Sequence, residues 1–532
     1  MNAEKEAIQI WKETYPILAY IAGLKQYAGQ IWIPSHHNKK NTLARIQKIE
    51  KKADEVTKKF LKAIKRDLMF EEPHRPPGEI LDIFFAHLIL EGIKEKRILT
   101  LAEQSINLLA VQEETTNKKW PIEIQIFTIQ QCDGAKAILE TIKKKTKGET
   151  KQALTALQKR IEDWKNKTTK LKLKTKDYKE IYPILQKKSK GLGRKKTYNS
   201  YLKDLYDYTE TPEQIEQLAV KWIEQELPEF NKIINKLARK YKCKPTAEEI
   251  DKAIKKHQAI PLKKLIPEIK KLRKTLQKVA EKEWVKITPK YNVKLIETPS
   301  YLVPFMPTGA MQAFGALGKP HCLFYTTTDP RASPPNSLPD AAQIIIHEEY
   351  GHCVNFMNIC TSKNRKIEII ESTLCIPITE GLSFYRELES VKTFEKKTDK
   401  EAKKEIEKYV PYKDFVDAEK FVVMHWRMGR FLRAVSDSRL NREVQTFPEF
   451  IEWAHKKTGL SKKAIFDLIF HFQRMPGYAP TYSIFGQKLK EYQAKAIKKG
   501  YTQKEFNTYV ASSGFPARSI FERRLRKKFK LS

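Results

Sequence analysis

Apolar positions in the first 290 residues recur at spacings of three and four within Lys- and Glu-rich sequence, which is the pattern of amphipathic helices. Pro- and Gly-rich breaks at residues 71–79 and 190–196 separate these segments. In residues 209–241 a capping Thr precedes Pro212, and the pattern predicts a helix interrupted near Pro228. This half of the chain is therefore predicted to be helical.

The residue composition changes between about residues 292 and 336, where β-branched and aromatic residues mix with Gly and Pro. Two or three strands are expected there. From Ser337 the helical pattern returns and persists to the end, with loops near residues 393–400 and 474–483. The pattern thus predicts a mainly α fold with one small sheet.

The segment 337–356, SLPDAAQIIIHEEYGHCVNF, carries the strongest chemical signal. Ser337, Pro339 and Asp340 have the spacing of a helix start. An apolar run to Ile346 then leads directly to a His-Glu pair and a second His. Burying such polar groups costs free energy unless they have partners, and a metal ion would be such a partner.

The two histidines, His347 and His352, are five residues apart, whereas zinc peptidases of the H-E-x-x-H type space them by four. Five residues turn an ideal helix by about 140°, which would point the two rings in different directions. A bulge that adds one residue to the turn would restore their convergence, and such bulges are frequent at functional sites. Gly351 is the residue expected to tolerate the distortion.

A catalytic zinc site needs three protein ligands and one open position. Pro377 and Thr379 suggest that a helix begins just before Glu380, which would place this carboxylate in a first turn. Glu380 is the expected third ligand, and Glu371 and Glu387 remain alternatives.

Charge and composition limit the other classes of function. The 532 residues include 101 Lys and Arg against 64 Asp and Glu, a net charge of +37, and 41% are apolar, which excludes wholesale disorder. Residues 141–200 hold 20 basic and 5 acidic side chains, but Leu154, Leu157 and Ile161 lie among them at helical spacing. We therefore interpret the lysines as a solvated helix face, with only incidental affinity for nucleic acid.

The six cysteines contain no CxxC pair and are typical of a reducing compartment. The longest nearly uncharged stretch, residues 81–93, is too short to span a bilayer, and the amino terminus has no signal-peptide pattern. We expect a cytoplasmic protein without membrane insertion. Its oligomeric state is not predictable from the sequence.

Six blocks of the chain occur together in a characteristic order. They are YTETPEQIEQLAVKWIEQEL, GKPHCLFYTTTDP, HEEYGH, TEGLSFYREL, RFLRAVSDSRLN and RMPGYAPTYSIFGQKLKEYQAKA. Through these blocks the chain, from about residue 201 to residue 521, resembles the domain-of-unknown-function 885 family, a group taken to be zinc peptidases related in outline to helical oligopeptidases and carboxypeptidases. Family members usually read H-E-x-x-P-G-H-H. This chain lacks that proline, has Cys353 in the last place and has one residue fewer between its histidines, which is closer to the H-E-x-x-G-H of the dipeptidyl peptidase III type.

The resemblance implies one Zn²⁺ per chain, bound by His347, His352 and Glu380, with Glu348 as the general base. It also implies a two-lobed, zincin-like helical metallopeptidase with the small sheet next to the active-site helix. Short peptides would be its substrates, and a net positive charge would favour acidic ones. The alternatives are a polyanion-binding (RNA-binding) scaffold with a vestigial metal site and a zinc amidohydrolase acting on a non-peptide amide.

Several further residues are candidates for contacts with the substrate or with a ligand. The family's last block places Tyr482, with Tyr478 next to it, as the phenol that stabilises the oxyanion. Phe324, Tyr325 and Thr326 are expected in an edge strand that pairs with an extended peptide.

Three charged side chains complete the expected site. Arg474 or Arg433 could pair with a substrate carboxylate. Asp437 could orient a ligand histidine, although it could equally be an ordinary helix-surface residue.

We expect four regions along the chain. They are a helical amino-terminal region that is basic from about residue 141 (1–200), a helical part of the catalytic lobe (201–290), the sheet with the metal helix and the Glu380 helix (291–390), and a helical carboxy-terminal lobe with the substrate-binding tyrosines (391–532).

Overall fold

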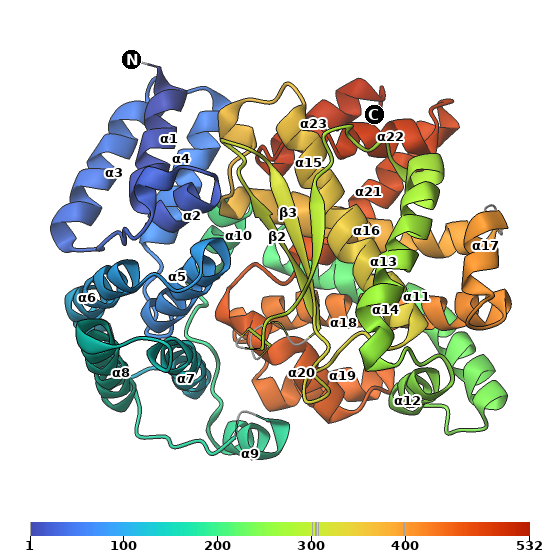
Figure 1. Ribbon diagram of the computed structural model, residues 1–532, viewed down its shortest axis with the longest axis horizontal. Coiled ribbons are helices and arrows are strands. Elements are labelled where there is room, and N and C mark those ends of the chain that lie inside the picture. The colour runs from blue at the N-terminus through green and yellow to red at the C-terminus, as the bar shows by residue number, and fades with distance from the viewer. Residues whose placement is uncertain are drawn as a thin grey trace.

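The computed structural model describes residues 2–175, 177–300, 302–303, 306, 308–396 and 400–531. Helices dominate these residues, and a small sheet lies among them (Figure 1). The mainly helical prediction with one small sheet is confirmed. No helix in the described part of the chain is both long and apolar enough to cross a bilayer.

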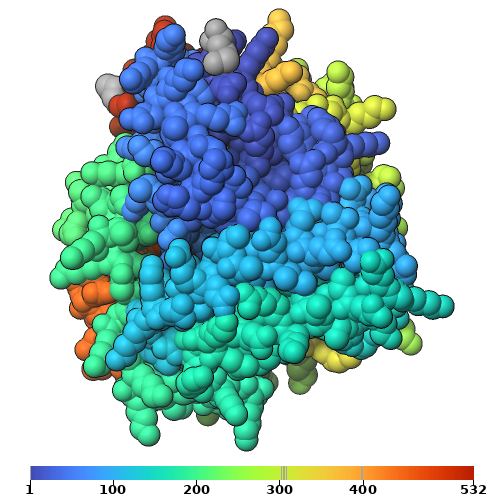
Figure 2. Space-filling view, turned by 90° about the vertical axis from the view of Figure 1, so that its left-hand side faces the viewer, coloured from blue at the N-terminus to red at the C-terminus, as the bar shows by residue number. Residues whose placement is uncertain are grey.

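The amino-terminal helices gather on one side of the sheet (Figure 1), and they form a continuous face of the molecule (Figure 2). Apolar residues of α8, including Leu154, Leu157 and Trp164, are buried in one cluster with residues of α5, α6 and α7, so the lysines between them form the solvated face. The helices are α1 (Ala3–Thr14), α2 (Pro16–Ile21), α3 (His36–Glu50), α4 (Glu55–Leu68), α5 (Arg75–Glu91), α6 (Glu95–Val111), α7 (Ile122–Lys143), α8 (Gly148–Thr168), α9 (Tyr178–Lys188) and α10 (Tyr198–Leu205), with 3-10 turns η1 (Lys25–Tyr27) and η2 (Glu113–Asn117).

The helix expected in residues 209–241 is α11 (Pro212–Tyr241), capped by Thr211 in a capping box with Gln214. The interruption expected at Pro228 is wrong, because the helix runs through it. Pro228 and Glu224, whose carbonyl loses its partner there, are both exposed, so water can replace the missing hydrogen bond. The chain continues through α12 (Ala247–His257), α13 (Leu262–Val279) and a short π-helix, η3 (Ala280–Trp284).

The sheet contains β1 (Val293–Glu297), β2 (Gly309–Phe314) and β3 (His321–Thr326) in the order β1-β3-β2. β1 pairs with β3 in parallel, and β2 pairs with β3 antiparallel. The expectation that Phe324, Tyr325 and Thr326 form an edge strand is wrong, because β3 is the central strand and both of its sides are paired. The strand with a free edge near the metal helix is β2, since β2 contacts that helix.

The second half of the chain packs helices around the sheet and the metal helix. The longest of them, α18, packs against α11, α14 and α16. The elements are α14 (Leu338–Ile345), the π-helix η4 (Ile346–Cys353), α15 (Val354–Thr361), η5 (Lys366–Glu368), η6 (Thr373–Cys375), α16 (Ile376–Glu395), α17 (Lys400–Ile406), α18 (Tyr412–Asn441), α19 (Phe447–Thr458), α20 (Lys462–Ile469), η7 (Phe470–Arg474), α21 (Thr481–Lys498), α22 (Gln503–Val510) and α23 (Arg518–Lys528).

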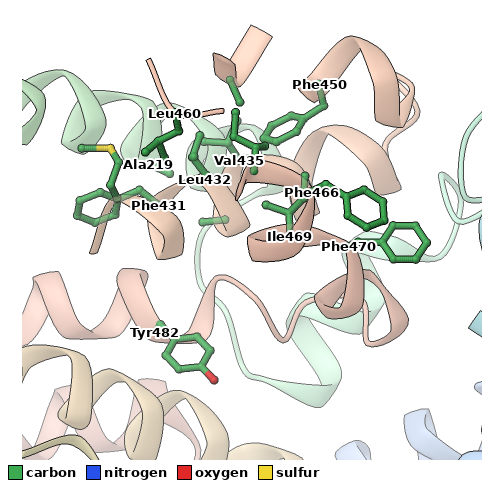
Figure 3. Packing of buried hydrophobic residues seen from close by; sticks show 14 of the residues in the cluster. Ala219, Phe431, Leu432, Val435, Phe450, Leu460, Phe466, Ile469, Phe470 and Tyr482 are labelled. Atoms are coloured by element: carbon green, nitrogen blue, oxygen red, sulfur yellow. The ribbon is translucent and has the colours of Figure 1, made fainter. Parts of the chain in front are cut away.

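The core is continuous across distant parts of the sequence. One cluster joins Phe127 of α7 with Phe431 of α18 and Phe470 of η7. Figure 3 shows Tyr482 apart from the other labelled residues of this cluster, with its hydroxyl turned away from them. A second cluster joins Trp11 of α1 with Leu374, which precedes α16. The amino-terminal helices therefore pack directly against the segment that carries the expected metal ligands.

Candidate metal centre

The helix that carries the histidines is wound as a π-helix from Ile346 to Cys353, between the α-helical segments α14 and α15. A π-helix places one extra residue in each turn. As a result, the Nε2 atoms of His347 and His352 lie 3.3 Å apart and face each other. The predicted bulge is confirmed, and it makes the two imidazoles converge.

Gly351 has a different role from the one expected. It is not among the residues with positive φ, so the backbone does not need glycine for its conformation. A Cβ at this position would lie 2.3 Å from Ser383 Oγ and 2.8 Å from Ser383 Cα. Gly351 therefore lets α16 approach the π-helix closely.

Glu380 of α16 completes the cluster. Its Oε2 lies 3.7 Å from His352 Nε2 and 4.0 Å from His347 Nε2. Within the described residues, these three side chains are the only group of three or more His, Cys, Asp or Glu residues whose ligand atoms come close enough to hold a metal ion. Of the three candidate carboxylates, Glu380 is the one brought to the histidines in this way.

Three observations fit a divalent cation at this position. Glu380 Oε2 is buried without a hydrogen-bond partner. His347 Nδ1 lies 2.7 Å from the carboxylate Glu387 Oε1, and a proton on Nδ1 leaves the lone pair of Nε2 directed at the other two donors. Three electron-rich atoms that face one another repel unless a cation lies between them. The 3.3 Å separation of the two nitrogens also matches two zinc–nitrogen bonds of about 2.0–2.1 Å at a tetrahedral angle.

Glu387 orients His347 and is not brought to the metal position. The guanidinium Nη1 of Arg430 donates to Glu387 Oε2 at 2.6 Å, and both residues are buried. Burial raises the pKa of Glu387, but Arg430 and His347 outweigh it and lower the pKa overall. Burial lowers the pKa of His347, and the hydrogen bond and charge of Glu387 more than compensate and raise it.

Asp437 does not orient a ligand histidine, so that alternative is wrong. Its Oδ2 accepts hydrogen bonds from the hydroxyl of Tyr198 at 2.5 Å and from the backbone N–H of Gly477 at 2.9 Å. Asp437 thus holds the turn before the tyrosine helix. The residue that contacts a candidate ligand histidine is Glu387. The sequence contains one indication of it, because Glu387 lies two helical turns after Glu380 on the same face. No pattern in the sequence indicated Arg430.

Glu348 lies beside the cluster and against the sheet. Its Oε2 accepts a hydrogen bond of 2.9 Å from the backbone N–H of Met311 in β2. Burial, countered in part by His347, raises the pKa of Glu348 to about 7. A carboxyl group with these properties can both take up and release a proton near neutral pH.

Tyr478 and Tyr482 lie near the other carboxylate oxygen of Glu380, Oε1. Tyr478 donates from its hydroxyl to Glu380 Oε1 at 2.8 Å, and the hydroxyl oxygens of Tyr478 and Tyr482 are 3.0 Å apart. Burial and the nearby charge of Glu380 raise the pKa of both phenols, so both stay protonated and can donate hydrogen bonds.

A cavity of about 510 Å³ joins these groups. Both histidines, Glu348, Glu380 and both tyrosines line it, together with the edge of β2 and residues of α2. Glu371 lines it as well, but Phe324, Tyr325, Thr326, Arg433 and Arg474 are not among the described residues of its wall.

The two arginines expected to hold a substrate carboxylate lie elsewhere. Arg474 donates from Nε to the carbonyl oxygen of His471 at 3.1 Å. Arg433 donates to the carbonyl oxygen of Leu468 and lies over the ring of Phe472. The structure therefore does not support a carboxylate-binding arginine in the cavity.

The family described as a bacterial protein of unknown function (DUF885) matches residues 91–525 of the chain. No curated protein matches this chain. A crystal structure from Colwellia psychrerythraea, described as a "putative lipoprotein", has a TM-score of 0.72 at 15% identity and covers 100% of this chain and 99% of that one. A structure from Shewanella oneidensis, described as a "putative lipoprotein of unknown function", has a TM-score of 0.69 at 14% identity and covers 99% of this chain and 100% of that one. Such identities show a shared fold alone.

Proposed function

Because the chain belongs to the DUF885 family, whose description assigns no activity, we propose a function from the site itself, namely a zinc-dependent metallopeptidase that hydrolyses short peptides. The observation that carries this proposal is the convergence of His347, His352 and Glu380 next to a buried carboxyl group, Glu348, in one cavity. The two-lobed, zincin-like description of the fold is part of the same proposal.

His347 and His352 through Nε2, and Glu380 through Oε2, would hold the zinc ion. Zinc bound there supplies a Lewis acid that polarises a carbonyl group and makes a water molecule more acidic. Glu348 takes a proton from the attacking water and passes it to the leaving amine, so that water is added across the C–N bond. A hydroxyl of Tyr478 or Tyr482 donates a hydrogen bond to the carbonyl oxygen as negative charge develops on it.

The edge of β2 offers a place for the peptide backbone. Met311 turns its N–H away from β3 and toward Glu348, so Ala313, two residues further, faces the same way and lines the cavity. The Met311 N–H is used by Glu348, so an extended peptide can pair as an additional strand through the Met311 carbonyl group and the backbone groups of Ala313. The cavity volume lies within the range of about 300–1,000 Å³ that is typical of sites for small ligands, which favours short peptides over folded proteins.

Metal analysis and digestion of a peptide library test this function together. We expect about one zinc per wild-type chain and none in His347→Ala. Glu348→Gln should keep its zinc and lose about 10²- to 10⁴-fold in peptide hydrolysis. The exposed Glu401→Gln is the matched control and should behave as wild type. Peptide cleavage by Glu348→Gln at the wild-type rate would refute the assignment.

Two other outcomes point to the alternatives. Stoichiometric zinc without cleavage of any peptide would favour hydrolysis of a non-peptide amide. Absence of zinc together with salt-sensitive binding of RNA would favour a polyanion-binding scaffold.

We also propose a cytoplasmic location, because all six cysteines are free thiols, and cell fractionation tests it.

A further inference from the structure

The cavity has the opposite electrostatic character from the rest of the protein. The chain carries a net charge of +37, yet no Lys or Arg occurs among the described residues of the cavity wall, and three carboxyl groups do: Glu348, Glu371 and Glu380. Glu380 belongs to the metal cluster and Glu348 lies beside it. Glu371 has no part in the chemistry described above.

Glu371 is held in place by its backbone, while none of the described residues is a partner of its side chain. The indole N–H of Trp11 in α1 donates to the Glu371 carbonyl oxygen at 2.9 Å. No described residue donates a hydrogen bond to the Glu371 carboxylate or forms an ion pair with it. Glu371 is an exposed residue of the cavity wall.

Glu371 lies toward one particular end of β2. Its neighbours Ile369, Ile370 and Leu374 share an apolar cluster with Ala316 and Leu317, which directly follow β2. The same end is closed by α2, whose Ile21 and Ala22 carbonyl oxygens accept hydrogen bonds from Gly315 and Leu317. The carboxylate is thus near the carboxy-terminal end of the strand.

The direction of β2 determines which end of a peptide lies there. Antiparallel pairing is the more common and slightly more stable arrangement of neighbouring strands. A peptide paired antiparallel to β2 directs its amino terminus toward Phe314 and the end that α2 closes, and its carboxy terminus toward Gly309. The peptide's positively charged end therefore lies at the end of the cavity that holds Glu371, whose carboxylate has no partner among the described residues.

We propose that Glu371 binds the α-ammonium group of a short peptide, so that the protein is an aminopeptidase that releases residues from the amino terminus. This inference rests on the proposed peptidase function. It replaces the expected preference for acidic peptides, because the wall of the cavity repels substrate carboxylates and attracts an ammonium group. Glu371 acts as a specificity-determining residue.

Binding and cleavage of matched peptides test the role of Glu371. Titration calorimetry with Glu348→Gln compares trialanine with N-acetyl-trialanine, so that binding is measured without hydrolysis. The free peptide should bind about 10- to 100-fold more tightly, the factor that a charge-assisted hydrogen bond supplies. Adding Glu371→Gln should abolish this difference, while Glu371→Asp should retain part of it.

Kinetics of the zinc-loaded protein provide the second measurement. N-acetylation should reduce kcat/KM of wild type about 10- to 100-fold, and Glu371→Gln should reduce it for the free peptide to the acetylated level. The peptide N-acetyl-Lys-Ala-Ala carries its only ammonium group on the lysine side chain. If Glu371 recognises the α-ammonium group, this peptide should be as poor a substrate as N-acetyl-trialanine. Glu401→Gln should change nothing.

The failures of the two proposals are distinguishable. If wild type hydrolyses no peptide, the metallopeptidase function fails. If wild type cleaves free and acetylated peptides equally well, or if Glu371→Gln lowers both rates by the same factor while zinc content is unchanged, the ammonium-binding role of Glu371 is overturned and the peptidase stands.

Discussion

Each of the three acidic residues near the metal position has a role that depends on one or two contacts. Glu380 directs Oε2 at two imidazoles, Glu387 accepts from His347 Nδ1, and Glu348 accepts from a strand backbone. All three are carboxyl groups on neighbouring helices. Only their partners distinguish the proposed metal ligand from the residue that contacts His347 and from the proposed base.

Replacing Glu387 with Gln should weaken metal binding without removing a ligand. The amide can still accept from His347 Nδ1, but it lacks the charge that increases the basicity of the imidazole. We expect about a 10- to 100-fold loss of zinc affinity, measured by competition with a chelator. The loss should appear as metal affinity in folded protein, which circular dichroism verifies.

Two variants define the outcome of that experiment. Glu401→Gln, which removes the charge of an exposed carboxyl group paired with Lys278, is the control and should bind zinc as wild type does. Unchanged zinc affinity in Glu387→Gln would contradict the orienting role of this carboxylate.

At the scale of elements, the π-helix and α16 form the site through their close packing. The π-helix makes His347 and His352 converge, and α16 supplies Glu380 at a distance that Gly351 permits. The two elements pack closely against each other. Binding of a metal ion at the proposed site is therefore expected to depend on helix packing.

Gly351→Ala should separate these two helices. The added methyl group overlaps Ser383, and overpacking of this kind costs about 1–3 kcal/mol. We expect lower stability in urea unfolding and weaker zinc binding, because Glu380 moves with α16. Ser383→Gly in the same chain removes the overlap with Oγ and Cβ but not with Cα, and it should recover part of the lost stability. It also removes the contact of 3.1 Å between Ser383 Oγ and His352 Nδ1, so zinc binding should recover less.

Full zinc affinity in Gly351→Ala would show that α16 can shift without moving its carboxylate. The helix propensity of Ala exceeds that of Gly, so local helix formation alone would predict a gain in stability. The sign of the stability change thus separates packing from propensity.

At the scale of the whole molecule, buried ion pairs join segments that are far apart in sequence. Arg518 of α23 is fully buried and donates to Glu210 and Glu522, and Lys488 of α21 also pairs with Glu210. Burial raises the pKa of Glu210, but Arg518 and Lys488 outweigh it and lower the pKa to about 2. This network attaches the carboxy-terminal helix to the segment before α11.

The network should make stability depend on pH. A carboxyl group whose pKa is lower in the folded state stabilises the fold above its unfolded pKa, and this contribution is lost as the pH falls through the folded value. Between about pH 4.5 and 2 the wild type should lose stability from this source. Glu210→Gln should be less stable at pH 7 by about 3 kcal/mol and should show a flatter acid limb in urea unfolding.

An acid limb as steep in Glu210→Gln as in wild type would assign the pH dependence to other groups. Glu401→Gln again serves as the control, because its exposed pair with Lys278 contributes little.

Local sequence patterns predicted the local features correctly. Ser337 caps α14 and accepts from the Asp340 N–H, as its spacing to Pro339 and Asp340 indicated. The described residues between Val293 and Thr326 form three strands, in the region where the residue composition changes. The five-residue spacing of the histidines required a bulge, and the π-helix provides it. Each of these features depends on interactions between residues close in sequence.

Features that depend on distant partners were not predictable in the same way. β3 is central because it inserts between β1 and β2, which no pattern within CLFYTT reveals. Pro228 is tolerated inside a helix because this part of the helix is exposed, so water can replace the backbone hydrogen bond that proline cannot make. Asp437 binds Tyr198, which lies 239 residues away, and no signal near it indicated this partner.

The sequence by itself determined that His347, Glu348 and His352 would lie on one distorted helix, because the spacing of side chains along a helix is a property of the local backbone. Only the tertiary structure decided that Glu380 reaches the histidines while Glu387 contacts one of them and Glu371 lines the cavity. These carboxyl groups are chemically alike, and their surroundings are created by α1, α16 and α18, which come together from segments hundreds of residues apart.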